Sequence, residues 1–510
     1  MITRLHLEDW RIIGHYLGVL ILLVAIAMIP PFIMSLCLSE FSTAVDFLLS
    51  IGITGIVGSV LLFSKVELAT LDWRQSLVIT GLCWVVLSVF GALPLWLSGH
   101  YDGYLDAFFE SVSAFTTTGM SLCVDVDHMA LSLSIWRCLM HLIGGIGVVV
   151  IALALGVFGT GSAAASLYHA EARMGQVMPG IKQTSQFILK LAAVVVVVGT
   201  LVCIIPLLAV GTEPLRAVIN GFLVTAAAFS TGGMTSSASG IIAFHSWPLE
   251  VFALVLAAFG CINFVLYGDI WKGIFRNFFK DIEIRTIFVW VTLLAILMAF
   301  ALAGSYFTTT GGVVRRGLFE VLSGGFNLGF STLQGGQVLF AMGSGALFVI
   351  ILSMTICGSS SSASGGIKAL RIGIIARSVV QAIREALAPD RARPRTFYFQ
   401  KGRHRLTPEL VSSAMIIFLL YMVTYAVGAI AGIAYGYEAL PAIFDSVSAA
   451  SNTGLSLGVA APGMPNGLEI IYIFEMWLGR LEFIAILAMV VEMLAFLVPR
   501  RRSKWVRRKK

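Results

Sequence analysis

Long apolar runs alternate with short polar segments along the whole chain. Several runs reach or exceed the roughly 20 residues that a helix needs to cross a bilayer. The first run follows an acidic, polar N-terminus without a small-residue cleavage site, so we interpret it as a retained span and not as a signal peptide. The pattern predicts ten spans, at residues 12–38, 43–63, 75–98, 132–158, 186–209, 247–271, 287–305, 337–357 with a continuation at 367–380, 409–435 and 467–498.

A short polar segment with a glycine in a fixed position recurs four times between these spans. The copies read FTTTGMS, FSTGGMT, GFNLGFS and ASNTGLS, and their shared glycines, called the filter glycines below, are Gly119, Gly233, Gly329 and Gly454. Acidic residues stand nine positions before three of these glycines: Glu110, Glu320 and Asp445, with Val224 at the second. One such copy alone is typical of a glycine turn in a loop, but four copies in register indicate a repeated structural unit.

Each filter glycine is preceded by an apolar segment that is too short to cross a bilayer. These segments are residues 105–115, 215–226, 314–323 and 440–450. Because non-helical backbone at membrane depth must be covered by protein or line a watery cavity, four such breaks predict one shared central pore. Each repeat then consists of a span, a short pore helix that enters from the outside, and a second span.

The predicted fold is an all-α integral membrane protein with an N-terminal two-helix hairpin and four pseudo-symmetric repeats around this pore. The predicted units are a membrane hairpin at 1–63, pore repeat 1 at 64–159, pore repeat 2 at 160–280, pore repeat 3 with a broken second span at 281–400, and pore repeat 4 with a basic cytoplasmic tail at 401–510.

Composition and charge support the membrane assignment. The 510 residues are 58% hydrophobic and 12% charged, whereas soluble proteins carry about a quarter charged residues. Most of the 34 lysines and arginines fall in alternate loops, so the positive-inside rule predicts that both termini are cytoplasmic. The basic tail at 499–510 is interpreted as an anchor to membrane lipid and not as a nucleic-acid patch. The seven scattered cysteines are interpreted as packing residues.

The glycine segments have the composition of a cation selectivity filter. Backbone carbonyls commonly replace the water of a dehydrated cation, and glycine allows the conformations that turn them inward. Pore helices that end at the filter would also direct their negative dipole ends to the ion. The residues predicted to line this filter and bind the cation are Thr116, Thr117, Thr118, Gly119, Ser230, Thr231, Gly232, Gly233, Asn327, Leu328, Gly329, Asn452, Thr453 and Gly454. Glu110, Glu320 and Asp445 are expected to brace the pore helices.

Two other features are unusual inside membrane spans. A run of small residues from Gly358 to Gly366 cannot hold a stable isolated helix and predicts that the second span of repeat 3 is broken. Arg480 lies within the last span, where an arginine normally faces a bundle interior or a water-filled cavity and is a functional candidate.

These motifs, together with the stretches 136–147 and 476–483, resemble the Trk/Ktr/HKT superfamily of potassium transporters. The extra N-terminal hairpin and residues 168–172 are similar to its bacterial TrkH branch in particular. The resemblance implies potassium uptake across the bacterial inner membrane as a multi-pass protein, a homodimer with one pore per protomer, and a cytoplasmic nucleotide-binding regulatory ring of the TrkA type. It implies no covalently bound cofactor, with the potassium ion as transported ligand.

The resemblance also assigns roles to residues. In this superfamily a serine at the first filter glycine is associated with sodium permeation, so four glycines imply a preference for potassium. Gly358 to Gly366, including Ser359, Ser360 and Gly365, would be an intramembrane gating loop, with Lys368 just beyond it, and Arg480 would lie across the pore below the filter. The third and fourth copies depart from the pattern in lacking threonines at Asn327 and Asn452.

Alternative interpretations remain open at this level. The serine-rich run could be a flexible linker, Arg480 could pair with Glu475 or Glu482, and Gly144, Gly145 and Gly147 could allow close helix packing. Arg137 and His141 could form a structural polar cluster.

The main alternative function is a proton- or sodium-coupled potassium symporter, although such proteins usually have inverted repeats and buried mid-membrane carboxylates. A membrane enzyme lacks support, because the chain has no H-E-x-x-H, nucleophile elbow or P-loop motif. A pure scaffold would not need four filter glycines.

Overall fold

The computed structural model describes residues 7–63, 72–147, 181–302, 313–333, 335–389, 396–481 and 483–497. Within these ranges the chain is helical apart from two short sheets. The parallel pair is β1 (Ile356–Cys357) with β2 (Ile367–Lys368), and the antiparallel pair is β3 (Phe397–Gln400) with β4 (Gly402–Arg405). The predicted unit boundaries near residues 64 and 160, residues 168–172 and the basic tail at 499–510 lie outside the described residues.

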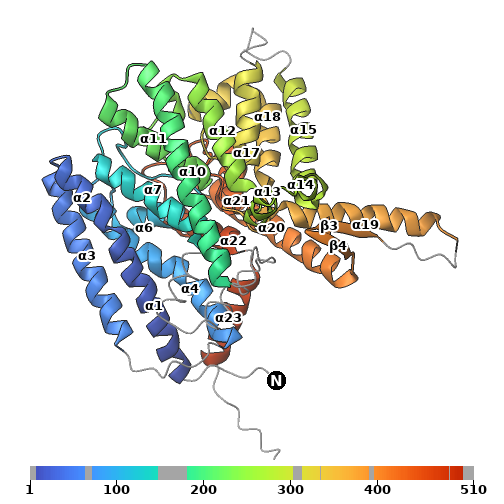
Figure 1. Cartoon of the computed structure of the whole chain (residues 1–510), viewed down its shortest axis with the longest axis horizontal. Helices are drawn as coiled ribbons and strands as arrows, with labels where there is room; N and C mark the ends of the chain where they lie inside the picture. Colours follow the sequence, from blue (N-terminus) through green and yellow to red (C-terminus); the bar gives the residue numbers. More distant parts are fainter. Residues whose placement is uncertain are drawn as a thin grey trace, which may run out of the picture.

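The N-terminal hairpin consists of α1 (Leu7–Ala27), α2 (Ile29–Cys37) and α3 (Phe41–Leu62). Helices α1 and α3 lie side by side along one edge of the molecule (Figure 1). Small residues allow this contact, because a Cβ at Gly18 would lie 3.0 Å from the carbonyl oxygen of Gly58. The structure therefore contains the hairpin that the sequence predicts.

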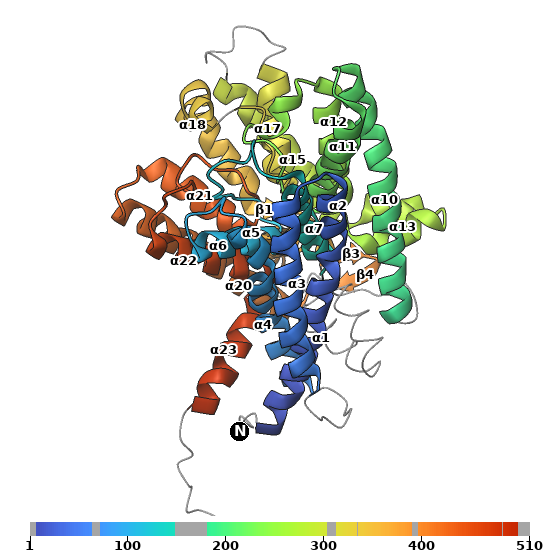
Figure 2. The same ribbon diagram turned by 90° about the vertical axis from the view of Figure 1, so that its left-hand side faces the viewer.

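Four repeats follow, and in each the helix that ends at the filter segment stands between two other helices along the chain (Figures 1 and 2). Repeat 1 contains α4 (Trp73–Gly91), α5 (Leu93–Leu97), α6 (Tyr104–Phe115) and α7 (Leu131–Gly145). Repeat 2 contains α10 (Ile181–Ala209), α11 (Pro214–Phe229), the 3₁₀ helix η1 (Gly240–Phe244), α12 (Trp247–Cys261), α13 (Phe264–Trp271) and α14 (Phe275–Lys280). Repeat 3 contains α15 (Ile282–Leu302), the π-helix η2 (Val313–Gly317), α17 (Leu318–Gly325), α18 (Gly335–Thr355) and α19 (Ala369–Leu387). Repeat 4 contains α20 (Pro408–Ala434), α21 (Ala439–Ser451), α22 (Asn466–Leu481) and α23 (Ile484–Leu497).

Several of the ten predicted spans are not single continuous helices, and part of the span 132–158 lies outside the described residues. Among the described residues, six helices are long and apolar enough to cross a membrane, or seven if one bent pair counts as a single span. That pair is α12 and α13, which meet at an angle of 95° inside the predicted span 247–271. The segment 467–498 is likewise divided between α22 and α23, next to Phe483 with its φ of 67°, and α18 is kinked at Gly343.

The molecule has many exposed apolar side chains, as expected of a membrane protein, while several of its charged groups are buried. Phe288 of α15 is 71% exposed and Ile205 of α10 is 68% exposed. By contrast, three carboxylates of the short helices, Glu110, Glu320 and Asp445, are at most 1% exposed. Because burial of polar groups without partners is costly, the polar interior must be an organised network.

Candidate functional site

The four pore helices α6, α11, α17 and α21 end in the same way. In each, the residue just before the filter glycine donates its N–H to the carbonyl five positions back, and the residue before that is left-handed. This is the Schellman arrangement that ends helices. The bonds are Thr118 to Ser113 at 2.8 Å, Gly232 to Ala227 at 2.9 Å, Leu328 to Ser323 at 2.8 Å and Thr453 to Ser448 at 2.9 Å. The left-handed residues are Thr117, Thr231, Asn327 and Asn452, with φ of 58°, 57°, 51° and 57°.

The filter glycines form a closed ring. All four have positive φ, between 69° and 93°, and a Cβ added at any of them would strike the backbone of the next repeat. The obstructing atoms include the carbonyl oxygen that precedes the neighbouring filter glycine. Gly119 meets the carbonyl of Gly232, Gly233 that of Leu328, Gly329 that of Thr453, and Gly454 that of Thr118. Four glycines and four carbonyl oxygens therefore alternate around one centre, one of each from every repeat.

This ring opens onto a cavity of about 450 Å³ that all four filter glycines line. The wall also carries hydroxyl groups, one from each repeat and each two positions after the filter glycine: Ser121, Thr235, Ser331 and Ser456. Arg137 and Glu320 contribute charged groups to the same wall. The structure thus brings the four glycine segments, which are far apart in the sequence, to one cavity with a mixed polar and apolar lining.

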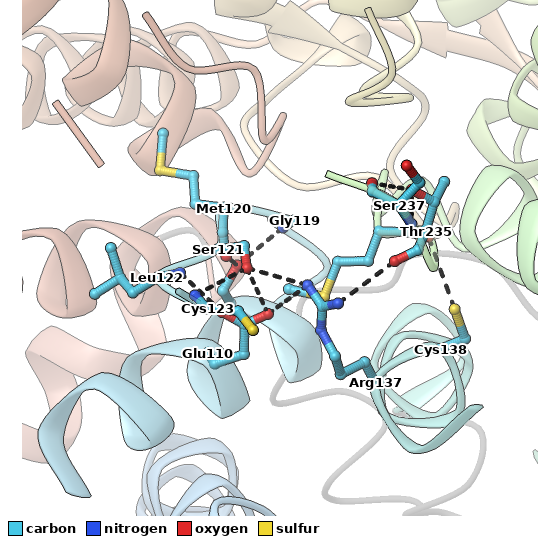
Figure 3. Close-up of polar contacts among 12 residues, drawn as sticks. Glu110, Gly119, Met120, Ser121, Leu122, Cys123, Arg137, Cys138, Thr235 and Ser237 are labelled. Carbon is cyan, nitrogen blue, oxygen red and sulfur yellow. Dashed lines mark hydrogen bonds and ion pairs between the residues drawn. The ribbon is translucent and has the colours of Figure 1, made fainter. Parts of the chain in front are cut away.

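Buried carboxylates connect three pore helices to the chain that follows the filter. Glu110 accepts hydrogen bonds from the hydroxyl of Ser121 and the N–H of Leu122, both at 3.0 Å, and forms an ion pair of 2.6 Å with Arg137 (Figure 3). Glu320 accepts from Ser331 and Thr332 at the matching positions. The same pattern in repeat 4 joins Asp445 to Ser456, Leu457, Val459 and Ala460. The bracing role expected of these carboxylates agrees with this geometry.

Repeat 2 has Val224 in place of the carboxylate. Side chains of α7, which belongs to repeat 1, contact the filter segment of repeat 2 instead. The guanidinium of Arg137 donates to the carbonyl of Thr235 at 3.4 Å, and the Cys138 thiol lies 3.7 Å from the carbonyl of Met234 (Figure 3). Arg137 therefore joins the first two filter segments, which supports its interpretation as a structural residue.

The hydroxyl residues after the filter glycines were missed by the sequence prediction. The signal was visible, because a serine or threonine recurs two positions after every filter glycine. Its partner, an acid nine positions before the glycine, recurs in three of the four copies. Only the spacing of both residues taken together would have predicted the hydrogen bond.

The two asparagines that replace threonines link neighbouring repeats. The Asn327 amide donates to the carbonyl of Ser451 at 2.9 Å. The Asn452 amide donates to the hydroxyl of Thr118 at 2.8 Å and to the carbonyl of Met476 at 2.9 Å. These side chains therefore hold the third, fourth and first filter segments together.

Other predicted filter side chains are engaged within the protein. The Thr116 and Ser230 hydroxyls donate back to carbonyls of their own pore helices. Leu328 lies in an apolar cluster, and Thr453 contacts the side chain of Asn327 at 3.3 Å. The backbone at Gly232 lies against the buried ring of His141. Most of these side-chain groups are therefore occupied by contacts within the protein.

The loop at residues 358–366, hereafter loop 358–366, packs directly against the filter segments. Pairing of β1 with β2 brings its two ends together, and nearly all of its residues are buried. A Cβ at Gly365 would strike the Asn452 side chain, and one at Gly366 would lie 3.0 Å from the carbonyl of Ser451. Lys368 donates its ammonium group to the carbonyl of Ser364. This packing does not fit a free, flexible linker.

Arg480 joins the filter, α7 and loop 358–366. Its guanidinium donates to the carbonyls of Ala363 and Gly144 at 2.5 Å each and to the Thr117 hydroxyl at 3.2 Å. It also lies 5.4 Å from the ring of Trp84. The carboxylate of Glu475, one alternative partner, accepts a hydrogen bond from Ser446 at 3.0 Å, while Glu482 lies outside the described residues.

The glycines at and just after the end of α7 allow close packing. This was one of the alternatives that the sequence left open. A Cβ at Gly144 would strike the carbonyl of Phe115, and one at Gly145 would lie 3.0 Å from the side chain of Ser230. Gly147 leaves room for the ring of Trp84.

Several buried polar groups were missed by the sequence prediction. Loop 358–366 is hydrogen-bonded to the break between α12 and α13, where Asn263 caps α13, and to Glu283 in the first turn of α15. Burial, with the nearby Glu283 charge, raises the pKa of Asp281, just before α15, to about 7. Glu469 of α22 is also buried, as is Glu475, which the sequence suggested only as a possible partner of Arg480.

Comparison with known proteins relates the whole chain to cation transporters. The family described as TrkH, cation transport protein, matches residues 44–495. An uncharacterized cation transporter of Methanocaldococcus jannaschii is 30% identical over 493 residues, which cover 96% of this chain and 97% of that protein. The Trk system potassium uptake protein TrkH of Escherichia coli K12 is 27% identical, with 94% of this chain and 98% of that protein covered.

A solved structure has the same fold. The crystal structure of the potassium transporter TrkH from Vibrio parahaemolyticus matches with a TM-score of 0.80 over 96% of this chain and 99% of that chain. Their sequences are 23% identical, so this likeness concerns the fold. The predicted all-α membrane fold is therefore confirmed, with the four short strands as additions.

Proposed function

The chain belongs to the TrkH family of cation transport proteins, and from this premise we propose that it takes up potassium through a channel-like pore whose selectivity filter is the ring of four glycines and four carbonyl oxygens. As a member of a transport family it is not an enzyme, as the sequence predicted. The proposed ligands are the backbone oxygens around the filter glycines, and potassium is the transported ion.

The ring geometry is the observation that supports this proposal. A filter must replace the hydration shell of a cation, and backbone carbonyls at close quarters do this. Each filter glycine leaves room for a carbonyl of the next repeat, so the ring depends on all four repeats at once. Relatives named potassium uptake proteins, such as that of Escherichia coli K12, favour potassium as the cation.

We propose that loop 358–366 and Arg480 form the gate. The loop lies directly against the fourth filter segment, and the arginine bonds to the loop and to Thr117 of the first. A fixed positive charge on the ion path opposes cation passage, so opening requires movement of both groups. The proposed setting is a bacterial inner membrane, with both termini cytoplasmic.

Transport in proteoliposomes tests the proposal. Purified protein should pass potassium and rubidium at least about tenfold faster than sodium, which corresponds to about 1.4 kcal/mol of discrimination. The reversal potential should follow the potassium gradient alone under opposing proton or sodium gradients. Equal sodium flux would reject the filter, whereas a reversal potential that shifts with the proton or sodium gradient would favour the coupled symporter.

A further inference from the structure

Glu283 of α15 has a fully buried carboxylate that contacts loop 358–366. It does not belong to any of the four filter segments. One carboxylate oxygen accepts the backbone N–H of Ser360 at 2.8 Å. The other accepts from the side-chain amide of Asn263 at 3.0 Å. The two oxygens of one side chain therefore hold the loop and the break between α12 and α13 together.

The surroundings of Glu283 fix its position. The side-chain oxygen of Asn263 caps α13 by accepting the N–H of Val265 at 3.0 Å, so its amide group is oriented toward Glu283. The carboxylate of Asp281 accepts the N–H of Glu283 at 2.8 Å. Hydrogen bonds to a charged acceptor are stronger than neutral ones, and a buried partner left without one is costly.

Three further contacts between the loop and the α12–α13 break are hydrogen bonds between backbone groups. Ser359 and Ala363 donate to the carbonyls of Cys261 and Gly260, and Phe264 donates to that of Ser361. Glu283 differs from these because it comes from a third element, α15. A movement of α15 relative to the loop would therefore break this contact first.

Helix α15 is also placed to transmit such a movement. It packs against α19, which continues directly from the loop, and against β3. Helix α19 and the β3–β4 hairpin project from one side of the molecule (Figure 1). A force on this projection acts on α15 and on the loop at once.

We infer that Glu283 is a positioning residue that latches loop 358–366 to the α12–α13 break in the closed pore, and that release of the Ser360 N–H is a step in opening. This inference rests on the proposed function of the loop as the gate.

The experiment combines potassium flux in proteoliposomes with hydrogen–deuterium exchange of peptides covering residues 356–368 in the full-length protein. Replacing Glu283→Ala should raise flux about tenfold, equivalent to about 1.4 kcal/mol, and speed exchange at the Ser360 amide by a similar factor. The preference for potassium over sodium should not change, because the filter segments keep their contacts. Glu283→Gln keeps the shape of the side chain and one acceptor oxygen, so it should give a smaller rise in flux. It also tests the proposal if the alanine variant does not fold.

The matched control is Glu409→Gln, which changes an exposed glutamate in the first turn of α20 and should alter neither quantity. A variant with a shortened loop 358–366 separates the two proposals. If the short loop raises flux and the Glu283 variants do not, the latch is wrong and the gate stands. If no variant raises flux, the gate proposal fails and the latch fails with it.

Discussion

At the scale of single residues, the filter depends on backbone conformations that few side chains allow. Threonine and asparagine occupy left-handed positions two residues before the filter glycines, at a cost of about 1–3 kcal/mol each. The surrounding bonds offset this cost: Asn452, for example, donates to Thr118 and Met476. The filter glycines add a second requirement, since they need both positive φ and room for a carbonyl of the next repeat.

Replacing Gly119→Ser should lower the potassium preference over sodium by roughly tenfold, or about 1.4 kcal/mol, without unfolding the protein. The new Cβ would displace the carbonyl of Gly232 and so enlarge the ring on one side. Relative rubidium and sodium fluxes measure the effect. Gly99→Ser is the matched control, because Gly99 has a similar φ of 73° but open space around it. Equal selectivity loss in both variants would argue against the ring.

At the scale of elements, broken helices place the loop and the filter together. The break between α12 and α13 provides backbone groups for loop 358–366, and the β1–β2 pair closes the loop at its base. Backbone groups of the α12–α13 break and of the loop are paired with each other by hydrogen bonds. The loop is therefore a packed element. It can move only if these hydrogen bonds break and others replace them.

Replacing Arg480→Ala should raise potassium flux by about tenfold or more, because a unit charge about 4 Å from a cation opposes it by about 4 kcal/mol at an effective dielectric constant near 20. The proposed measurement is rubidium uptake into proteoliposomes at matched protein density. Arg276→Ala, at an exposed arginine of α14, serves as the control. Unchanged uptake in the Arg480 variant would remove this residue from the gate.

At the scale of the whole molecule, regulation requires a surface that reaches beyond the membrane-embedded body. Helix α19 and the β3–β4 hairpin provide a projection with exposed basic residues, among them Lys401, Arg403 and Arg405. We propose that a nucleotide-binding ring of the TrkA type binds this surface and that two copies of the chain form a homodimer, as the resemblance implies.

Charge reversal at Arg403→Glu together with Arg405→Glu should weaken binding of such a ring by at least about tenfold, and the wild-type affinity should fall with added salt. Affinity measured on the full-length protein in detergent tests this. Arg216→Glu, at an exposed arginine in the first turn of α11, should leave the affinity unchanged. If the reversed pair binds as tightly as wild type, the docking surface lies elsewhere.

The sequence by itself determined the membrane class and the four recurring glycine segments. These follow from local patterns: apolar runs of spanning length, and a glycine with fixed neighbours that recurs in register. The run of small residues at 358–366 and Arg480 could also be recognised in the sequence. Helix-breaking residues and a charged residue are both unusual inside a membrane span.

Only the tertiary structure decided which groups meet. Arg137 pairs with Glu110, Arg480 bonds to Ala363, and Glu283 bonds to Ser360, across separations of tens to hundreds of residues. The 95° bend between α12 and α13 was also not predicted. Its backbone groups form hydrogen bonds with the distant loop 358–366, and the only local signs of the bend in the sequence are Gly260 and Asn263. Long-range contacts have no period along the chain. The closure of the glycine ring and the position of the proposed gate, loop 358–366 with Arg480, therefore depend on the fold as a whole.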